Sequence, residues 1–226
     1  MSLELVPTAT AAFIAGLSDR QMQRVVDEEI IGSPLVKREG VRGFAVMTTA
    51  LAKFYFATND TMTKDARLNV MHVIIDRVSK HKDADALFSL QGALDEVDWT
   101  VDLPALHVQL GSFVTDATDR VRLVKRAEES IVEDPDVMGG APVFKGTRVP
   151  AATVTASKRA GFDMDQLRAA YPFLTPDLVL DAETYLQIHP KIGRPRKDDA
   201  PPVKRKLVSS KRVALPPVDD FQAADR

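Results

Sequence analysis

Four side chains with strong hydrogen-bonding capacity stand together near the start of the chain: Arg20, Gln21, Gln23 and Arg24. Arginine can donate two parallel hydrogen bonds to the edge of guanine, and glutamine can form a similar bidentate pair with adenine. Such side chains reach base edges when they lie in the first turns of a helix that enters the major groove. These residue types therefore favour sequence-specific DNA contact, provided that a helix positions them.

The flanking residues predict that helix and a second one before it. Residues 8–16 are small and apolar and predict a short helix with Thr8 as its N-cap, followed by a turn at residues 16–18. Ser18 then caps a second helix over residues 19–31, with acidic Asp19 in the first turn, where the helix dipole favours it. The pattern A-x-x-x-G-L-S-x-R-Q-x-Q-R resembles the helix-turn-helix of MerR-like and excisionase-like DNA-binding proteins, so base readout by the second helix is the expected role.

A β-hairpin is expected directly after this helix pair. Residues 34–46 alternate in polarity around a turn at residues 37–43, which is typical of two short strands. Three basic side chains on this hairpin would point toward phosphates as a wing does: Lys37, Arg38 and Arg42. Residues 1–58 are thus predicted to form a winged helix-turn-helix, and the alternative is a solvated helix with a plain basic hairpin.

The middle of the chain, residues 59–130, is predicted to be a helical linker or dimerisation region. Helices are expected over residues 47–58 and 62–79, the second with Thr61 as a possible cap and an apolar stripe. The stripe consists of Leu68, Met71, Ile75 and Val78. Residues 97–103 alternate for one strand, which Pro104 ends, and Pro104 is also expected to open a helix to about Ser130. That helix would present Leu106, Leu110, Val114, Val121 and Val124 to a core or a dimer partner.

Residues 134–150 carry the string D-P-x-x-x-G-G-x-P-V-x-K-G-T-R-V-P, and residues 171–176 carry Y-P-x-L-T-P. Together they resemble closely the bacterial domain of unknown function 433 over residues 131–190. That family is described as antitoxin-like, and its members often accompany PIN-domain ribonuclease toxins of the VapC kind. The resemblance implies an antitoxin with a PIN-domain ribonuclease as its partner. Many members are short chains that lack the first 130 residues.

The local patterns in this module predict a hairpin and three helices. Strands over residues 142–145 and 147–149 would precede helices over residues 151–159, 164–171 and 177–189, with Asp163 and Thr175 as N-caps and Pro176 at the first helical position. This order resembles a homeodomain-like helix-turn-helix. The charged residues of the third helix are all acidic and would repel phosphates: Asp177, Asp181 and Glu183. The module is therefore expected to serve dimerisation or toxin docking, with Arg148 either a hairpin brace or a contact residue.

The last 36 residues differ in charge from the rest of the chain. Residues 191–226 hold ten Lys/Arg and five Asp/Glu, a charge of +5, and this leaves 20 and 27 in residues 1–190, a charge of −7. A Pro-rich, charged, aperiodic segment is expected to be disordered alone. VapB-like antitoxins typically inhibit their toxins with such an arm, and a basic arm could pair with the acidic metal site of a PIN ribonuclease. The predicted toxin-binding residues are Arg194, Arg196, Lys204, Arg205, Lys206, Leu207, Lys211 and Arg212. Gly193-Arg194-Pro195 also resembles an AT-hook, and a solubilising tail without a partner is the remaining alternative.

Several functional classes find no support in the sequence. The 226-residue chain is 45% hydrophobic and 27% charged, has no cysteine, and shows neither an apolar run of membrane-spanning length nor a secretory signal, so a cytoplasmic protein without membrane contact is expected. The four histidines lack metal-ligand spacing, and no set of side chains suits catalysis. We expect no catalytic residue, no metal and no cofactor.

The combined expectation is a mainly α protein with short β-hairpins: a winged helix-turn-helix, a helical middle, a homeodomain-like module and a basic extended tail. Its predicted function is that of a type II antitoxin, which inhibits a PIN-domain endoribonuclease through the tail and represses its own operon by binding operator DNA. A homodimer, or a higher hetero-oligomer with toxin, is expected because one recognition helix gives limited specificity. The alternative is a free-standing transcriptional regulator without a toxin partner.

Overall fold

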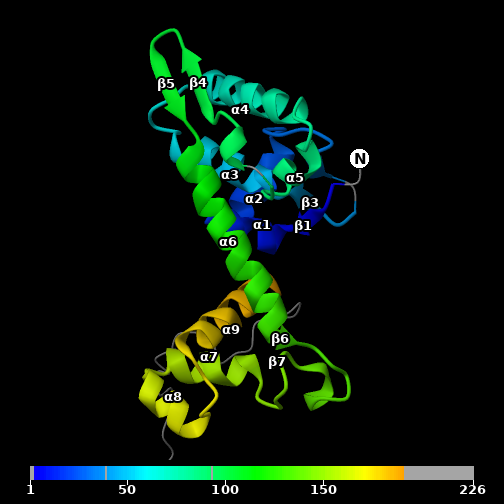
Figure 1. Cartoon of the computed structure of the whole chain (residues 1–226), viewed down its shortest axis with the longest axis vertical. Coiled ribbons are helices and arrows are strands. Elements are labelled where there is room, and N and C mark those ends of the chain that lie inside the picture. The colour runs from blue at the N-terminus through cyan, green and yellow to red at the C-terminus, as the bar shows by residue number, and fades with distance from the viewer. Residues whose placement is uncertain (1–2, 39, 93, 191–226) are drawn as a thin grey trace, which may run out of the picture. The chain divides into compact units, whose positions relative to one another are not determined.

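The computed structural model describes residues 3–38, 40–92 and 94–190, and the predicted toxin-binding residues of the tail lie outside these ranges. The chain divides into two units, Met1–Pro190 and Lys191–Arg226, of which the first is described below. It is mainly helical with small antiparallel sheets (Figure 1). Among the described residues, no helix combines the length and the apolar character needed to cross a bilayer.

The N-terminal elements form a three-stranded antiparallel sheet beside three helices. The strands follow the order β1-β3-β2, so that Phe44 on the central strand pairs with Val6 on one side and Val36 on the other. The elements are β1 (Leu5–Pro7), α1 (Thr8–Ala15), α2 (Asp19–Asp27), β2 (Val36–Lys37), β3 (Gly43–Ala45) and α3 (Met47–Ala57). The predicted hairpin is present, and the strand β1 that joins it was not predicted.

The first two helices differ in detail from the prediction. Pro7, not Thr8, precedes α1 as its cap residue, and no side chain caps that helix. The second helix ends at Asp27 rather than near Ile31, because Glu29 takes a φ of 53°. The backbone N–H of Glu29 donates to the carbonyl of Val26, and that of Ile30 donates to the carbonyl of Val25. This pair of hydrogen bonds ends many helices.

The middle of the chain contains a hairpin where a helix was expected. Strand β4 (Thr100–Leu103) pairs in antiparallel register with β5 (Leu106–Gln109), and Pro104-Ala105 forms the turn between them. The helix predicted from Pro104 therefore begins only at Gly111, and Leu106, expected to face a core or a dimer partner, lies on β5 and is 44% exposed. The signal for the second strand was the alternation that buries Val108 between exposed neighbours.

The other middle elements are helical. They are α4 (Lys64–Ser79), the short α5 (Ala84–Phe88), the 3-10 turn η1 (Leu94–Glu96) and the long α6 (Gly111–Ser130). Thr63, not Thr61, caps α4 by accepting a hydrogen bond from the backbone of Ala66. Only Met71 and Val78 of the predicted apolar stripe are buried, and Leu68 and Ile75 are half-buried.

The module at residues 131–190 contains the three predicted helices. The elements are β6 (Ile131–Val132), η2 (Met138–Gly140), β7 (Val143–Phe144), α7 (Ala151–Arg159), α8 (Met164–Ala170) and α9 (Pro176–Ile188). The side chains of Asp163 and Thr175 accept hydrogen bonds at the starts of α8 and α9, as predicted. The strand β7 pairs mainly with β6, although one bridge from Val143 to Pro150 remains of the expected hairpin.

Two clusters of buried apolar side chains hold these elements together. The first collects residues from Ala11 to Val124 together with Ile188 of α9, so it draws on both of the regions predicted at 1–58 and 59–130 and on the module. The second includes Phe144, Val154, Leu174 and Val179 of the module. Helix α6 contributes to both clusters, with Val114 to Val124 in the first and Ala127 in the second.

Candidate nucleic-acid interface

The turn between α1 and α2 is fixed by cations from two other helices. Gly16 ends α1 with a φ of 60°, a conformation that costs glycine little. Its carbonyl oxygen accepts a hydrogen bond from Nζ of Lys53 on α3 at 3.4 Å. The carbonyl oxygen of Phe13 accepts another from Arg120 on α6 at 2.8 Å. Both contacts tie the end of α1 to neighbouring helices, in addition to the hydrogen bond that the Phe13 carbonyl accepts from the backbone N–H of Gly16, and they help to set the direction in which α2 leaves the turn.

The start of α2 is a capping box between Ser18 and Gln21. The Ser18 hydroxyl accepts a hydrogen bond from the Gln21 backbone at 3.3 Å, and the Gln21 carboxamide oxygen accepts one from the Ser18 backbone at 3.0 Å. Ser18 was predicted as this cap. Gln21 was predicted to contact DNA, but its carboxamide oxygen is engaged in beginning the helix.

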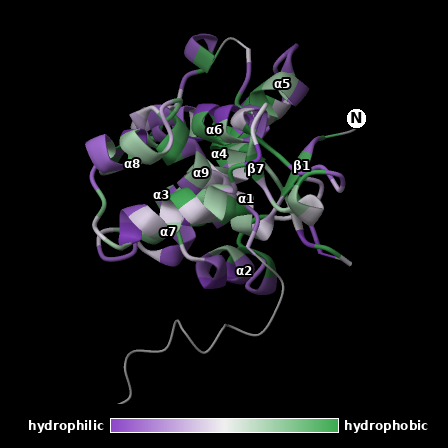
Figure 2. Cartoon of the chain, turned by 90° about the horizontal axis from the view of Figure 1, so that it is seen from below, coloured by the Kyte–Doolittle hydropathy of each residue, from purple (hydrophilic) through white to green (hydrophobic). Residues whose placement is uncertain are grey.

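The two sides of α2 differ in polarity. Met22, Val25 and Val26 are buried in the first apolar cluster. The predicted base-reading residues Arg20, Gln23 and Arg24 are exposed on the other side, where positions three and four apart are neighbours. Figure 2 shows hydrophilic residues along the outer side of α2. The structure thus brings these three side chains onto one exposed helical face.

Three of the predicted phosphate- or base-contacting arginines form ion pairs within the chain. The pairs are Arg24–Glu28 at 2.6 Å, Arg38–Glu29 at 2.6 Å and Arg42–Asp27 at 2.7 Å. Two of these ion pairs join the β2–β3 hairpin to α2: Arg42 pairs with Asp27, the last residue of α2, and Arg38 pairs with Glu29 just after it. Among the described residues, no ion pair involves Arg20 or Lys37. DNA phosphates would therefore have to displace carboxylates from three of the five predicted cations.

The ion pairs favour the charged forms of Glu28 and Glu29. The hydrogen bond from Arg24 lowers the pKa of Glu28, and the hydrogen bond from Arg38 lowers the pKa of Glu29. The Arg24 guanidinium also lies 5.3 Å from the centre of the Phe56 ring, a second contact that orients it.

The local charge balance had not been considered in the prediction. Residues 19–42 contain five Lys/Arg and five Asp/Glu, so this stretch is neutral overall. The signal was available, since Arg24 and Glu28 stand four positions apart on one helix and such pairs are neighbours. A neutral surface gives less nonspecific attraction to phosphates than the basic residues alone imply.

The acidic residues of α9 do not form the exposed negative face that was expected. Asp181 is only 2% exposed, and its two carboxylate oxygens accept hydrogen bonds from Arg126 at 2.7 Å and from Ser130 at 2.9 Å. Glu183 pairs with Lys158 of α7 at 2.8 Å, and Asp177 lies 3.4 Å from Arg126. Basic residues of neighbouring helices therefore compensate much of the acidic charge of α9, and the expectation that this helix does not contact DNA stays a prediction.

A second polar contact lies close to Asp181 in sequence. The Tyr185 hydroxyl donates a hydrogen bond to Glu133 at 3.3 Å. Burial, followed by the charge of Glu133, raises the pKa of Tyr185 to about 12. Within the part of the chain that the structure describes, no group of three or more His, Cys, Asp or Glu side chains could hold a metal ion.

Comparison with known proteins supports part of the sequence interpretation. A family model described as "Protein of unknown function (DUF433)" matches residues 131–186. The "Uncharacterized protein y4eO" of Sinorhizobium fredii (strain NBRC 101917 / NGR234) is 30% identical over 211 residues, which cover 93% of this chain and 93% of that protein.

One solved structure is similar over most of this chain. It is the X-ray crystal structure of Rv2018 from Mycobacterium tuberculosis, with 18% sequence identity and a TM-score of 0.36. The similarity covers 81% of this chain and 100% of that one.

Proposed function

The chain belongs to the family of the protein y4eO and carries the domain of unknown function 433, and on that premise we propose that it is a DNA-binding antitoxin of a type II toxin–antitoxin pair. It inhibits a PIN-domain endoribonuclease and represses its own operon. The observation that carries the DNA-binding part is the exposed face of α2, with Arg20, Gln23 and Arg24 opposite a buried apolar face.

In this proposal α1, α2 and the β2–β3 hairpin act as a winged helix-turn-helix. The fixed turn at Gly16 and the capping box at Ser18 give α2 a defined direction, so its outer face can enter the major groove as one surface. Within the described residues Arg20 has no carboxylate to give up, so it is available to contact a base. Arg24 gives up its ion pair with Glu28 when it contacts DNA, and Lys37 on the hairpin contacts a phosphate.

The neutral charge of residues 19–42 gives this binding a particular character. Each arginine that leaves a carboxylate for DNA loses an ion pair, and this loss offsets part of the gain from the phosphate. Tight binding then requires matched base contacts, so affinity depends on sequence more than on nonspecific attraction.

The toxin-binding part of the proposal rests on the resemblance of residues 131–190 to antitoxin-like proteins. It assigns inhibition to the basic segment after Pro190, which lies outside the described residues. The module itself is proposed to provide dimerisation or docking, with its homeodomain-like helices as a scaffold. A transcriptional regulator without a toxin partner is the second candidate, because the DNA-binding part alone stands on described residues.

The test of the DNA-binding part is a titration of the full-length protein with a duplex from the upstream region of its own gene. Changing Arg20 and Arg24 to Ala should weaken binding at least ~10-fold, because each bidentate base contact contributes about 1–3 kcal/mol of discrimination. The matched control is Arg159→Ala with Lys82→Ala, since both residues are exposed and lie in other helices or turns. Equal affinities for the two double variants would refute the assignment of α2.

The test of the toxin part uses the protein product of a neighbouring PIN-domain gene. Full-length protein should suppress the ribonuclease activity of that product, and residues 1–190 alone should not. Suppression by residues 1–190 would keep the antitoxin function and move the contact to the folded body. No suppression by either form would favour the plain transcriptional regulator.

A further inference from the structure

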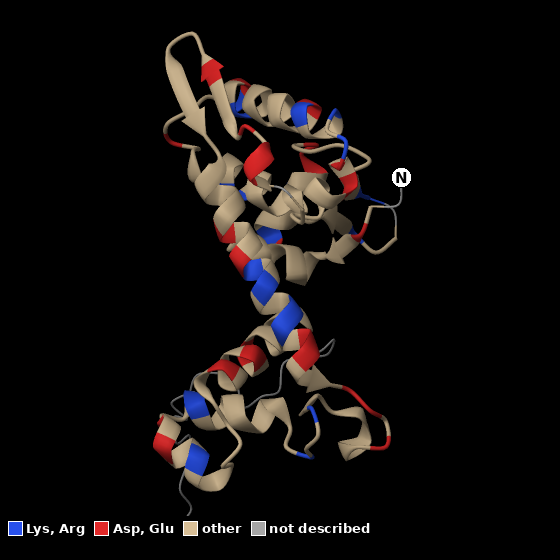
Figure 3. Cartoon of the chain, viewed as in Figure 1, with Lys and Arg blue, Asp and Glu red and all other residues tan. Residues whose placement is uncertain are grey.

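The loops on either side of β7 carry opposite charges that do not pair with each other. Glu133, Asp134 and Asp136 follow β6, whereas Lys145 and Arg148 follow β7. Among the described residues, no ion pair joins these two groups, and none involves Lys145 or Arg148 at all. Figure 3 shows the acidic segment and the two cations at separate positions beside β6 and β7. Both signs of charge are therefore available to a partner.

Arg148 was expected either to stabilise its own hairpin or to contact a partner, and it does not stabilise the hairpin. Its side chain is exposed and makes no hydrogen bond to the described residues. The turn is closed instead by Thr147, whose hydroxyl donates to the carbonyl of Phe144 at 2.9 Å and accepts from the backbone of Val149 at 3.1 Å. The fold leaves Arg148 without an internal function.

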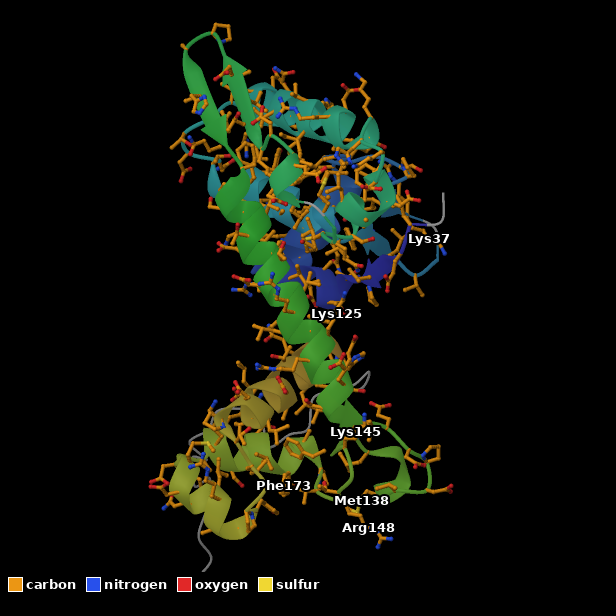
Figure 4. All side chains as sticks on the ribbon, in the orientation of Figure 1. Lys37, Lys125, Met138, Lys145, Arg148 and Phe173 are labelled. Atoms are coloured by element: carbon orange, nitrogen blue, oxygen red, sulfur yellow. The ribbon has the colours of Figure 1, made fainter. Side chains whose placement is uncertain are left out.

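An apolar side chain lies between the acidic and basic segments in sequence and is exposed in an unfavourable conformation. Met138 is 56% exposed and has a φ of 50°, and Gly139 follows with a φ of 66°. A positive φ is strained for a residue with a side chain, and an exposed strained residue gives the isolated chain no packing in return. Figure 4 shows Met138 and Arg148 both directed away from the ribbon at the same end of the module.

We propose that this surface, consisting of Asp136, Met138 and Arg148, binds the same surface of a second copy of the chain through a two-fold axis. In such a contact Arg148 of each copy meets Asp136 of the other, and the two Met138 side chains meet near the axis. A two-fold contact requires a self-complementary surface, and loops of opposite charge on either side of β7 can provide one. The inference rests on the dimerisation role that the proposed function gives to this module and names the surface that would perform it, although the contact requires neither DNA nor a toxin.

The charge pattern favours a protein partner over nucleic acid. A phosphate backbone presents one sign of charge, so the carboxylates beside Met138 would repel it. Methionine adapts its shape to apolar protein surfaces and adds contact area at such a site. The cations and the carboxylates lie within residues 133–148 of the same chain. A second copy therefore presents both signs of charge and can pair each group with one of opposite charge.

Sedimentation of full-length protein over a range of concentrations tests the inference. Wild type should show a reversible dimer, and Arg148→Glu or Asp136→Arg should each weaken it at least ~10-fold, because two symmetric pairs become like-charged at once. A mixture of the two single variants is the decisive sample. In the mixed dimer the new carboxylate of the Arg148→Glu copy meets the new guanidinium of the Asp136→Arg copy. The other symmetric contact keeps the original pair of Asp136 and Arg148, so both contacts are matched and dimerisation should return.

Two controls separate the inference from simpler effects. Arg159→Glu makes the same charge change on α7 and should leave the dimer intact. Circular dichroism of each variant should match wild type, because the substituted side chains are exposed and form no ion pair with the described residues. A monomeric wild type, single variants that dimerise normally, or a mixture that stays monomeric would each overturn the inference. Since no DNA or toxin is present, these outcomes can be told apart from a failure of the DNA-binding or toxin-binding part of the proposed function.

Discussion

Arginine–carboxylate contacts occur in two regions of this chain with different surroundings. Around α2 and the β2–β3 hairpin, three arginines pair with carboxylates on an exposed surface. Where α6 meets the module, Arg126 pairs with Asp181 of α9, which is almost completely buried and also accepts a hydrogen bond from Ser130. Exposed pairs add little stability and can be exchanged for another anion, whereas a buried carboxylate is costly to leave without partners. The first set is suited to binding and the second to holding helices together.

The largest expected effect follows from removing one partner of the buried contact. Asp181→Ala should lower the free energy of unfolding by about 1–3 kcal/mol, because the Ser130 hydroxyl loses its acceptor and Arg126 loses its nearer carboxylate and keeps only Asp177 at 3.4 Å. Glu183→Ala on the same helix, which removes a more exposed pair with Lys158, should cost less than about 1 kcal/mol. Urea unfolding of both variants measures the difference. Equal losses would show that burial does not distinguish the two contacts.

A smaller loss is expected from the cap that begins α2. Ser18→Ala should destabilise the protein by about 1 kcal/mol, because the backbone N–H of Gln21 loses its side-chain acceptor and keeps only the Ser18 carbonyl. Ser112→Ala, an exposed serine of α6 whose hydroxyl makes no hydrogen bond to the described residues, is the control and should change little. Thermal unfolding compares them. A Ser18 variant as stable as the control would mean that contacts from Lys53 and Arg120 suffice to fix the turn.

Releasing the exposed arginines should strengthen DNA binding if the proposed function is correct. Glu28→Gln with Glu29→Gln frees Arg24 and Arg38, and binding to the upstream duplex should increase about 3-fold to 10-fold with a steeper dependence on salt. Glu128→Gln with Glu129→Gln makes the same charge change on α6 and serves as the control. If both double variants respond alike, only net charge matters, and the ion pairs around α2 do not regulate access to the arginines.

The smallest expected effect concerns Tyr185 at high pH. Its pKa in the folded protein is about 12, raised from 10.0, so the neutral phenol is favoured in the fold. The stability associated with this shift is fully present below pH 10 and is lost as the pH rises from about 10 toward 12. A phenolate absorbance titration should show one late tyrosine, and Tyr185→Phe should remove that step while Tyr171→Phe leaves it. Normal titration of Tyr185 would mean that Glu133 and burial do not act on it.

Local signals in the sequence predicted local structure well and long-range contacts poorly. The caps at Ser18, Asp163 and Thr175 were correct, because a capping side chain and the backbone N–H that donates to it lie within three residues. The helix expected from Pro104 was wrong, since a proline that can open a helix can equally occupy the turn of a hairpin.

The candidate interface shows the same limit. The residue types on the outer face of α2 were predicted, but the pairing of Arg42 with Asp27 joins positions 15 apart, and that of Arg126 with Asp181 joins positions 55 apart. No spacing rule along one helix gives such partners. The charge of each segment was read separately, so two surfaces were assigned an excess charge that the folded chain neutralises.

The long helix α6 has a consequence for how the family domain could be exchanged between proteins. The family match begins at residue 131, yet Asp181 is held by Arg126 and Ser130, and Ala127 is buried in the cluster of the module. A segment that is moved into another protein and keeps these contacts would therefore have to start inside α6, at least one helical turn before residue 131. In shorter proteins that carry the domain without such a helix, another segment must supply the cation and the apolar contact. A gene fusion that starts at residue 131 would leave the buried Asp181 without its partners Arg126 and Ser130.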